Sequence, residues 1–467
     1  MSYACRLLLR ISFFLACPLS VSAAPGLLLL EHPARLSFTG FGSSLAVVGD
    51  VDGDETPDYL VGAYQHRWQD HLKQGRAFVF SGHSGKLLYA LDNPHPQPDA
   101  GFGCAVAAAG DVNQDGITDL MVGAFGQGEK DTDLDLVRRS LAGPGEGEPA
   151  LKDAGSGQAF VFSGKDGQLL HSLEAPQQQK GAGFGWTVAS AGDLTQDNIP
   201  ELLVGAIGQA GGGRVFVFNG HDGSLLRILA PPPPASAAVF GRSITGTGDL
   251  NTDGVSDIFV GAPYTPVGEF TVQGQVHAFS GRDGSLLYTI NDPTPRPGAV
   301  FGWHVTSGGD FNQDGVSDVL VGAPYKDSDQ YRSHGAAFVF SGVDGSLIYA
   351  LKSPGLAKPY ATFGYRLSAV PDLNGDNTPE ILVAAPFQTV DELHLQGEVF
   401  LFNGRDGRHL ATFDNPDPHQ GSTFGYAIAS PGDVDGDELP DFAIGAAGQT
   451  IGDRVAVGRV YLFRSRQ

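Results

Sequence analysis

Short apolar runs alternate with polar, glycine-rich turns along this chain, and residues 301–324 contain the clearest copy of the pattern. A Phe-Gly pair precedes an apolar run at 303–307, an acidic stretch follows, and a second run occupies 319–321. Two more runs come after a loop of variable length, joined by Ser-Gly and Asp-Gly signals that are typical of a β-hairpin. Each copy therefore predicts four short strands.

The same unit occurs seven times at fixed offsets. Its Phe-Gly pairs begin at Phe41, Phe102, Phe184, Phe240, Phe301, Phe363 and Phe424. An Asp stands nine residues after each Phe, and a small residue stands twelve residues after each Asp. Constant spacing over so many copies indicates one repeated supersecondary unit. We predict an all-β fold, a seven-bladed β-propeller of four-stranded blades.

The two ends of the repeat region predict how the ring closes. Residues 27–31 form an apolar run that resembles a fourth strand with no preceding copy, and the last copy stops after its third run at 460–463. The N-terminal strand is therefore expected to pair into the last blade, so that residues 24–467 form one closed domain. Most of the length variation falls between second and third strands, where residues 125–156 include a long insert.

Residues 1–23 are predicted to be a secretory signal peptide. Arg6 and Arg10 precede a short apolar run that ends in a small-residue cleavage site at Ala23. The alternative, an apolar N-terminal core segment, is disfavoured because no repeat includes these residues. A secreted, periplasmic or extracellular location is expected, with Cys104 as the one cysteine left after cleavage. No later apolar run is long enough for a transmembrane helix.

The acidic composition restricts the possible partners. A net charge of −23 argues against nucleic acid, because phosphate binding needs a basic surface. Much of the acidity lies in the loops between first and second strands, which have oxygen side chains at positions 1, 3, 5 and 9. That arrangement suits Ca²⁺, which takes six to eight oxygen ligands. Several calcium sites, up to seven, are predicted on what is expected to be a monomer.

Six of these loops supply the predicted metal ligands. Their side chains are Asp50, Asp52, Asp54, Asp58, Asp111, Asn113, Asp115, Asp119, Asp249, Asn251, Asp253, Asp257, Asp310, Asn312, Asp314, Asp318, Asp372, Asn374, Asp376, Glu380, Asp433, Asp435, Asp437 and Asp441. Backbone carbonyls at position 7 are expected to add Ile117, Val255 and Val316. The third loop matches least well, with Asp193, Thr195, Asp197 and Glu201.

Two observations qualify the metal interpretation. Loops 1 and 7 have Glu55 and Glu438 at position 6, where the other well-matched loops have Gly. A positive φ at a glutamate is strained, so a different turn is predicted there. The alternative to metal binding is that Asp and Asn merely cap tight turns through bonds to the backbone. Four carboxylates in one loop repel each other without a cation, which argues against that alternative for loops 1 and 7.

The repeat resembles the FG-GAP repeat of the integrin α-subunit propeller. The resemblance rests on Phe-Gly, the D-x-[DN]-x-D-G-x-x-D loop and Gly-Ala-Pro, as in 261–263 and 322–324. It implies Ca²⁺ in several loops between first and second strands, and partner binding on the opposite face. Only Pro263, Pro324 and Pro386 keep the proline of the motif, and no leg domain or membrane span follows. An isolated, secreted adhesion or ligand-recognition module is therefore expected.

Aromatic residues at the start of the first strands are the candidate ligand-binding residues: Trp186, Trp303, Tyr365 and Tyr426. The resemblance implies that a basic side chain of a partner docks on such rings by cation–π contact. The long insert is expected to overhang the same face. The alternative is that these rings only pack at the mouth of the central channel.

No catalytic constellation is evident, because the histidines are scattered and the carboxylates belong to the acidic loops. An enzyme is therefore not expected. Two alternatives to protein recognition remain open: a carbohydrate-binding propeller, and a polysaccharide hydrolase or lyase built on the same fold.

Overall fold

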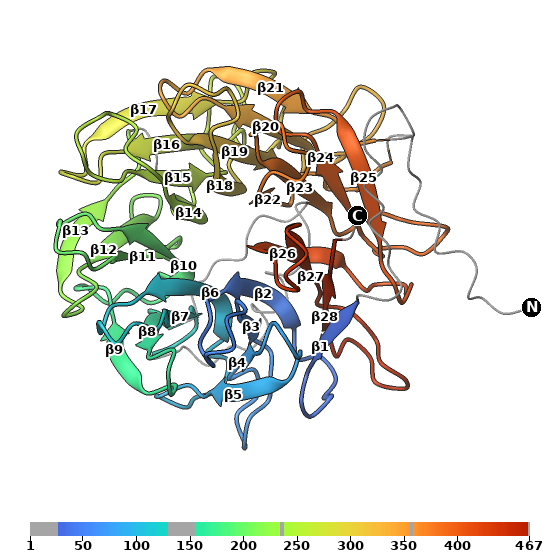
Figure 1. Ribbon diagram of the computed structural model, residues 1–467. Coiled ribbons are helices and arrows are strands. Elements are labelled where there is room, and N and C mark those ends of the chain that lie inside the picture. Colours follow the sequence, from blue (N-terminus) through green and yellow to red (C-terminus); the bar gives the residue numbers. More distant parts are fainter. Residues whose placement is uncertain (1–26, 129–154, 234–237, 355–357, 466–467) are drawn as a thin grey trace, which may run out of the picture.

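The computed structural model describes residues 27–128, 155–233, 238–354 and 358–465. Within these ranges the chain forms seven four-stranded antiparallel sheets around a central axis (Figure 1). The predicted all-β, seven-bladed propeller is confirmed. No helix long and apolar enough to cross a membrane is found in the described part of the chain. The predicted signal peptide, 1–23, and residues 129–154 of the long insert lie outside the described residues.

Each blade runs outward from an inner strand, and blade 1 begins with β2. The inner strands are β2 (Phe41–Val47), β6 (Phe102–Gly110), β10 (Phe184–Gly192), β14 (Ser243–Gly246), β18 (His304–Gly309), β22 (Arg366–Val370) and β26 (Phe424–Gly432). The second strands are β3 (Tyr59–Ala63), β7 (Asp119–Ala124), β11 (Glu201–Ala206), β15 (Ile258–Ala262), β19 (Asp318–Ala323), β23 (Glu380–Ala385) and β27 (Asp441–Ala446).

Outside these lie the third and fourth strands. The third strands are β4 (Arg76–Phe80), β8 (Gln158–Phe162), β12 (Arg214–Phe218), β16 (Gln275–Phe279), β20 (Ala336–Phe340), β24 (Glu398–Phe402) and β28 (Arg459–Phe463). The outermost strands are β5 (Leu87–Leu91), β9 (Leu169–Leu173), β13 (Leu225–Leu229), β17 (Leu286–Asn291), β21 (Leu347–Leu351), β25 (His409–Asp414) and, for blade 7, β1 (Leu28–Glu31).

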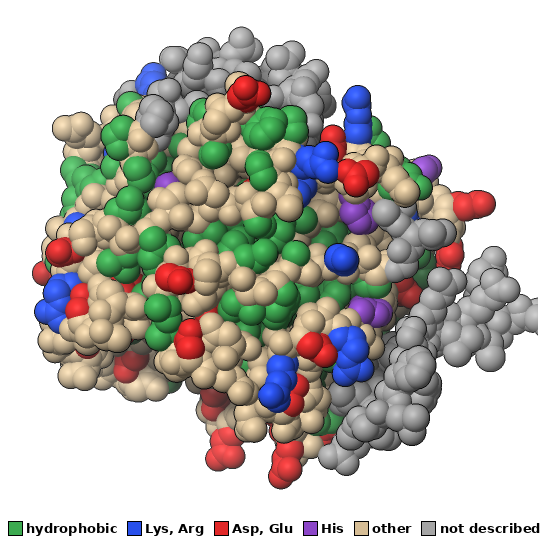
Figure 2. Space-filling view, turned by 90° about the horizontal axis from the view of Figure 1, so that it is seen from above, with side chains coloured by type: hydrophobic (Ala, Val, Ile, Leu, Met, Phe, Trp, Pro, Cys, Tyr) green, Lys and Arg blue, Asp and Glu red, His purple; other side chains and the backbone are tan. Residues whose placement is uncertain are grey.

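Burial follows the position of a strand in its blade. The second strands are apolar without alternation, and β7, β11 and β19 are buried along their whole length because neighbouring blades cover both faces. The outermost strands face solvent on one side, so β5 alternates in type and is largely half-buried. Hydrophobic side chains accordingly show on the rim of the ring when it is viewed edge-on (Figure 2).

The Phe-Gly pair joins each blade to the one before it. Phe102 is fully buried among side chains of blades 1 and 2, including Leu60 and Leu120. The backbone of Phe102 also bridges to Gly75, where a Cβ would lie 1.9 Å from the Phe102 carbonyl oxygen. A Cβ at Gly62 would meet the Gly103 carbonyl oxygen at 2.1 Å. Close backbone contact between blades therefore explains why small residues recur at these two positions.

The ring closes as the sequence predicts. Strand β1 pairs antiparallel with β28, with Leu30 opposite Val460 and Glu31 opposite Arg459. The Arg459 guanidinium forms an ion pair with Glu31 at 2.6 Å. Because Leu30 is fully buried, the N-terminal strand is an integral part of blade 7.

Hydrogen bonds define two faces of the ring. Loops between first and second strands bond to the turns between third and fourth strands, as when the Gly82 amide donates to Asp58 at 3.0 Å. We call this the acidic-loop face. Loops between second and third strands bond to the links between blades, as when the Asp99 amide donates to the Leu72 carbonyl at 2.8 Å. We call this the mouth face. Acidic side chains project from the lower edge of the ring in Figure 2.

Candidate functional site

The last acidic residue of each loop, position 9, is a structural clamp. The Asp58 carboxylate is fully buried and accepts bonds from the amides of Val51, at 2.8 Å, and Gly82, at 3.0 Å. Four other loops repeat both bonds at similar distances, through Asp119, Asp257, Asp318 and Asp441. The carboxylate therefore fastens the acidic loop to the next turn of its own blade, a role that the sequence reading missed.

Burial perturbs these clamping carboxylates. Loss of solvent raises the pKa of Asp58, Asp119 and Asp318 to about 6, although the amide bonds act in the opposite direction. Burial likewise raises the pKa of Glu380 and Asp441 to about 7, with a smaller contribution from neighbouring loop carboxylates. Ionised carboxylates at these positions are thus costly without a nearby cation.

The carboxylates at positions 1, 3 and 5 cap the turn of the loop. In loop 5, Asp310 accepts bonds from the amides of Asp314 and Gly315, at 2.9 and 2.7 Å. Asn312 accepts from the Asp314 amide and Asp314 accepts from the Val316 amide, each at 2.9 Å. The turn-capping alternative is therefore correct for these side chains. It does not exclude a metal, because each carboxylate oxygen has a second lone pair.

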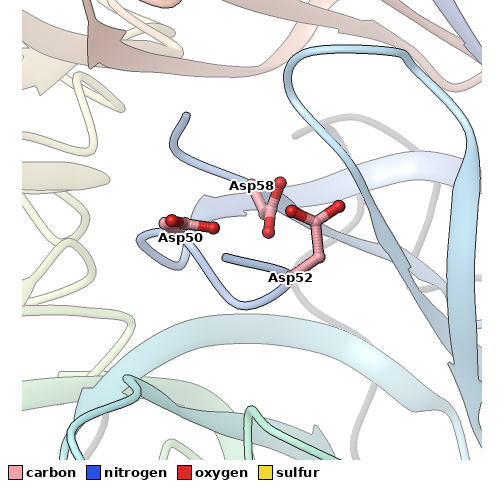
Figure 3. Close-up of side chains that lie close together, drawn as sticks. All are labelled: Asp50, Asp52 and Asp58. Atoms are coloured by element: carbon pink, nitrogen blue, oxygen red, sulfur yellow. The ribbon is translucent and has the colours of Figure 1, made fainter. Parts of the chain in front are cut away.

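Loops 1 and 7 bring three carboxylates together. Ligand oxygens of Asp50, Asp52 and Asp58 lie within 4.8 Å of one another, and Figure 3 shows the three groups converging on one point. The corresponding residues of loop 7 are Asp433, Asp435 and Asp441. One oxygen of Asp435 is buried without a hydrogen-bond partner among the described residues. This all-oxygen, anionic donor set with an unsatisfied oxygen fits a hard divalent cation.

The other loops are arranged differently around the same backbone. In loop 5 the Asn312 amide nitrogen donates to Asp314 at 2.8 Å, and in loop 2 the Asn113 amide nitrogen donates to Asp119 at 3.3 Å. In loop 4, the Arg282 guanidinium lies 3.4 Å from the Asp253 carboxylate. Loops 2, 4 and 5 matched the calcium pattern best in sequence, yet loops 1 and 7 show the closest convergence of carboxylates.

The predicted turn of loops 1 and 7 is wrong. Glu55 and Glu438 adopt positive φ values of 68° and 71°, in the same left-handed region as Gly315 at 89°. The loops therefore share one backbone course, and two glutamates accept the strained conformation. The clamp at position 9 and the capping bonds at position 1 fix both ends of the loop, which leaves position 6 no other conformation.

The four candidate aromatic residues surround a chamber of about 580 Å³ at the centre of the ring. The ring centroids of Trp303 and Tyr365 lie 5.7 Å apart, and those of Tyr365 and Tyr426 lie 5.5 Å apart. Trp186 packs against Phe125 at 5.1 Å. Trp303 and Tyr365 are only 7% and 5% exposed, so the packing alternative describes them well, whereas Trp186 and Tyr426 are half-buried.

Three further residues face this chamber: Arg242, His304 and Arg366. The Arg242 guanidinium lies 4.0 Å from the Trp303 ring centroid, so a cation of the chain itself already covers that ring. The sequence reading did not select these residues as site residues. Arg242 stands at the same repeat position as Trp303, and His304 and Arg366 stand one position later, so the offset from Phe-Gly was the available signal.

Comparison with known proteins agrees with this architecture. The protein-family model described as FG-GAP repeat matches residues 240–279, 301–340 and 363–402. The chain is an FG-GAP repeat protein. Each matched stretch covers the first three strands of one blade, in blades 4, 5 and 6. These are the blades that keep the full Gly-Ala-Pro motif.

The curated relatives of this FG-GAP protein are integrin α subunits. It is 29% identical to integrin alpha-4 of Xenopus laevis over 248 residues, which are 50% of this chain and 22% of the relative. It is 32% identical to human integrin alpha-11 over 222 residues, which are 45% of this chain and 18% of the relative. The match to human integrin alpha-10 is 29% over 311 residues, 61% of this chain and 25% of the relative. The chain thus spans a quarter or less of these relatives.

Proposed function

We propose that this FG-GAP propeller is a secreted, calcium-binding recognition module that holds a protein ligand on its mouth face. The observation that carries the proposal is the distribution of exposed apolar side chains over the described residues. Those on the mouth face are Leu36, Phe38, Leu72, Tyr331, Tyr360, Leu395 and Val455. On the acidic-loop face the corresponding set consists of Val343. The remaining large exposed apolar residues lie on outermost strands.

Part of the apolar set is continuous. The Phe38 amide donates to the Ala456 carbonyl at 3.0 Å, which places Phe38, 63% exposed, beside Val455, 50% exposed. Exposed apolar clusters rimmed by polar residues are typical of protein-binding surfaces. The similarity to integrin α subunits supports the same class of function.

Calcium is proposed to act on the opposite face as a structural element. Carboxylates at positions 1, 3, 5 and 9 would hold it in each loop, and loops 1 and 7 have the most convergent donor sets. When bound, the cation supplies the positive charge that offsets repulsion among the loop carboxylates. Melting curves in EDTA and in excess Ca²⁺ test this role. Identical curves, from protein shown to begin metal-free, would remove calcium from the proposal.

The ligand face is tested with variants matched in chemistry. Phe38→Ser with Val455→Ser changes the mouth face, and Val343→Ser changes an equally exposed apolar residue on the acidic-loop face. Affinity capture from extracellular extract of the source organism should recover the same protein with the wild type and with Val343→Ser, but not with the double variant. Loss of capture in Val343→Ser alone would place the ligand on the wrong face. A glycan array in parallel would reveal a carbohydrate ligand instead.

A further inference from the structure

The chamber differs in charge from the rest of the molecule. The chain has 52 acidic and 29 basic residues, yet no Asp or Glu is among the described residues that line the chamber. Its ionisable lining includes Arg242, His304 and Arg366, which come from the inner ends of three successive blades. Cationic groups are thus concentrated in the one large cavity of an acidic protein.

Aromatic rings hold the two guanidinium groups at the chamber wall. The Arg242 guanidinium lies 4.0 Å from the ring centroid of Trp303 and 5.7 Å from that of Trp186. The Arg366 guanidinium lies 5.4 Å from the ring centroid of Tyr365. A ring face attracts a cation but leaves the edge of the guanidinium, with its N–H donors, available to an anion.

Two neutral nitrogens add to this set of polar groups. The Trp303 Nε1 and His304 Nδ1 atoms are buried without a hydrogen-bond partner among the described residues. Trp303 is 7% exposed and lines the chamber, so its N–H donor is desolvated there. A buried donor without a partner is costly, and an acceptor brought into the chamber would satisfy it.

The cations also raise each other's energetic cost. Burial lowers the pKa of Arg366, and the charge of Arg242 acts in the same direction. Burial, together with the charges of Arg366 and Arg242, holds the pKa of His304 well below its usual range, so its imidazole is neutral near pH 7. An added cation would meet the same repulsion, whereas an anion would relieve it. This argues against a basic partner side chain at these rings.

We propose that the chamber binds a carboxylate of a protein partner, with Arg242 and Arg366 as the anion-binding residues. The inference rests on the proposed function, because the partner would reach the chamber from the mouth face. A volume of about 580 Å³ accommodates one or two side chains. The exposed apolar residues around the mouth, such as Phe38, favour a carboxylate flanked by apolar residues over one carried on a sugar rich in hydroxyl groups.

The wild-type protein gives the first test, using three capped peptides: Gly-Leu-Glu-Phe-Gly and its analogues with Gln or Lys at the centre. Binding is followed by isothermal calorimetry and by the fluorescence of the chamber tryptophans, Trp186 and Trp303. The Glu peptide should bind about tenfold or more tightly than the Gln peptide, the equivalent of one charge-assisted hydrogen bond. The Lys peptide should bind most weakly. Equal affinities for Glu and Gln peptides would overturn the proposal.

Variants then assign the effect to residues. Arg366→Gln and Arg242→Gln should each remove the preference for Glu over Gln, while Arg332→Gln, an exposed arginine on the mouth face, should retain it. Arg366→Lys keeps the charge and should retain part of the preference, which separates lost charge from a disturbed fold. A preference that survives in the Arg242→Gln, Arg366→Gln double variant would refute the residue assignment.

Two outcomes separate this inference from the proposed function. If the peptides do not discriminate, yet Phe38→Ser with Val455→Ser abolishes partner capture, the mouth-face function stands and the carboxylate inference fails. If glucuronate binds tightly and the Glu peptide does not, the chamber recognises an acidic sugar, and the protein-partner inference is wrong.

Discussion

Asp58→Ala should separate the clamping role of position 9 from metal binding. The substitution leaves two buried amides, those of Val51 and Gly82, without an acceptor. Each unsatisfied buried N–H costs about 1–3 kcal/mol, so the free energy of unfolding should fall by roughly 2–6 kcal/mol. Burial raises the pKa of Asp58 to about 6, so the variant also loses a charge that is costly to bury. The lower half of that range is therefore expected near neutral pH.

Asp52→Ala, in the same loop, is the matched control. Asp52 is exposed, and its carboxylate accepts one exposed amide bond, from Asp54 at 3.2 Å. In EDTA this variant should unfold almost as the wild type does. In Ca²⁺ it should lose the contribution of its site, about 2.7 kcal/mol when the free cation is 100 times the dissociation constant.

Denaturant unfolding followed by tryptophan fluorescence, in excess EDTA and in saturating Ca²⁺, measures both effects. Asp58→Ala should shift the midpoint in both conditions, and Asp52→Ala only in Ca²⁺. If Asp58→Ala is silent in EDTA, the two amide bonds contribute no net stability, and position 9 is a metal ligand alone.

Three further changes test other parts of the ring. Deleting residues 24–33 removes β1 and exposes the edge of β28, so the protein should aggregate in light scattering, whereas an equally stable monomer would contradict closure by β1. Glu438→Gly relieves a strained φ of 71° and should raise the free energy of unfolding by about 1 kcal/mol, while Gly436→Ala, at φ 80° with nothing within 4 Å of the added Cβ, should lower it by a similar amount; opposite signs in denaturant titrations would refute the strain argument. Burial lowers the pKa of His32 to about 4 and of His66 to about 3. Folding therefore favours the neutral imidazoles, and their stabilisation, complete above about pH 6.5, is lost as pH falls through the folded-state values. The loss from pH 6.5 to 4 should be smaller in His32→Gln, His66→Gln than in the wild type, a difference that cancels the opposite contribution of the clamping carboxylates.

Fixed offsets made the architecture predictable from the sequence. The distance from Phe102 to Asp111 and on to Gly123 is repeated in every blade because it spans one inner strand, one loop and one second strand. The orphan run at 27–31 predicted ring closure by the same reasoning, since a blade without a fourth strand has an open edge.

The chemistry within the loops was less predictable. Asp50 and Asp58 look equivalent in sequence, but only Asp58 lies under the next turn of its blade, where it is fully buried. The strained φ of Glu55 could not be anticipated either, because propensity at one residue is outweighed by bonds that fix both ends of its loop. Arg242 and Arg366 are 124 positions apart in the numbered chain, and they meet only because successive blades turn their inner strands toward one axis.

An acidic protein can recognise an acidic group because its charges are separated along the blade. Strand β18 runs from His304, at the chamber, to Gly309, one residue before Asp310 of the acidic loop. A six-residue strand spans about 20 Å, whereas exposed charges are screened over about 8 Å at physiological ionic strength. The loop carboxylates therefore do little to neutralise Arg242 and Arg366, and calcium would reduce their effect further. Net charge describes solubility and long-range encounter, while the local field in the chamber decides which ligand group it accepts.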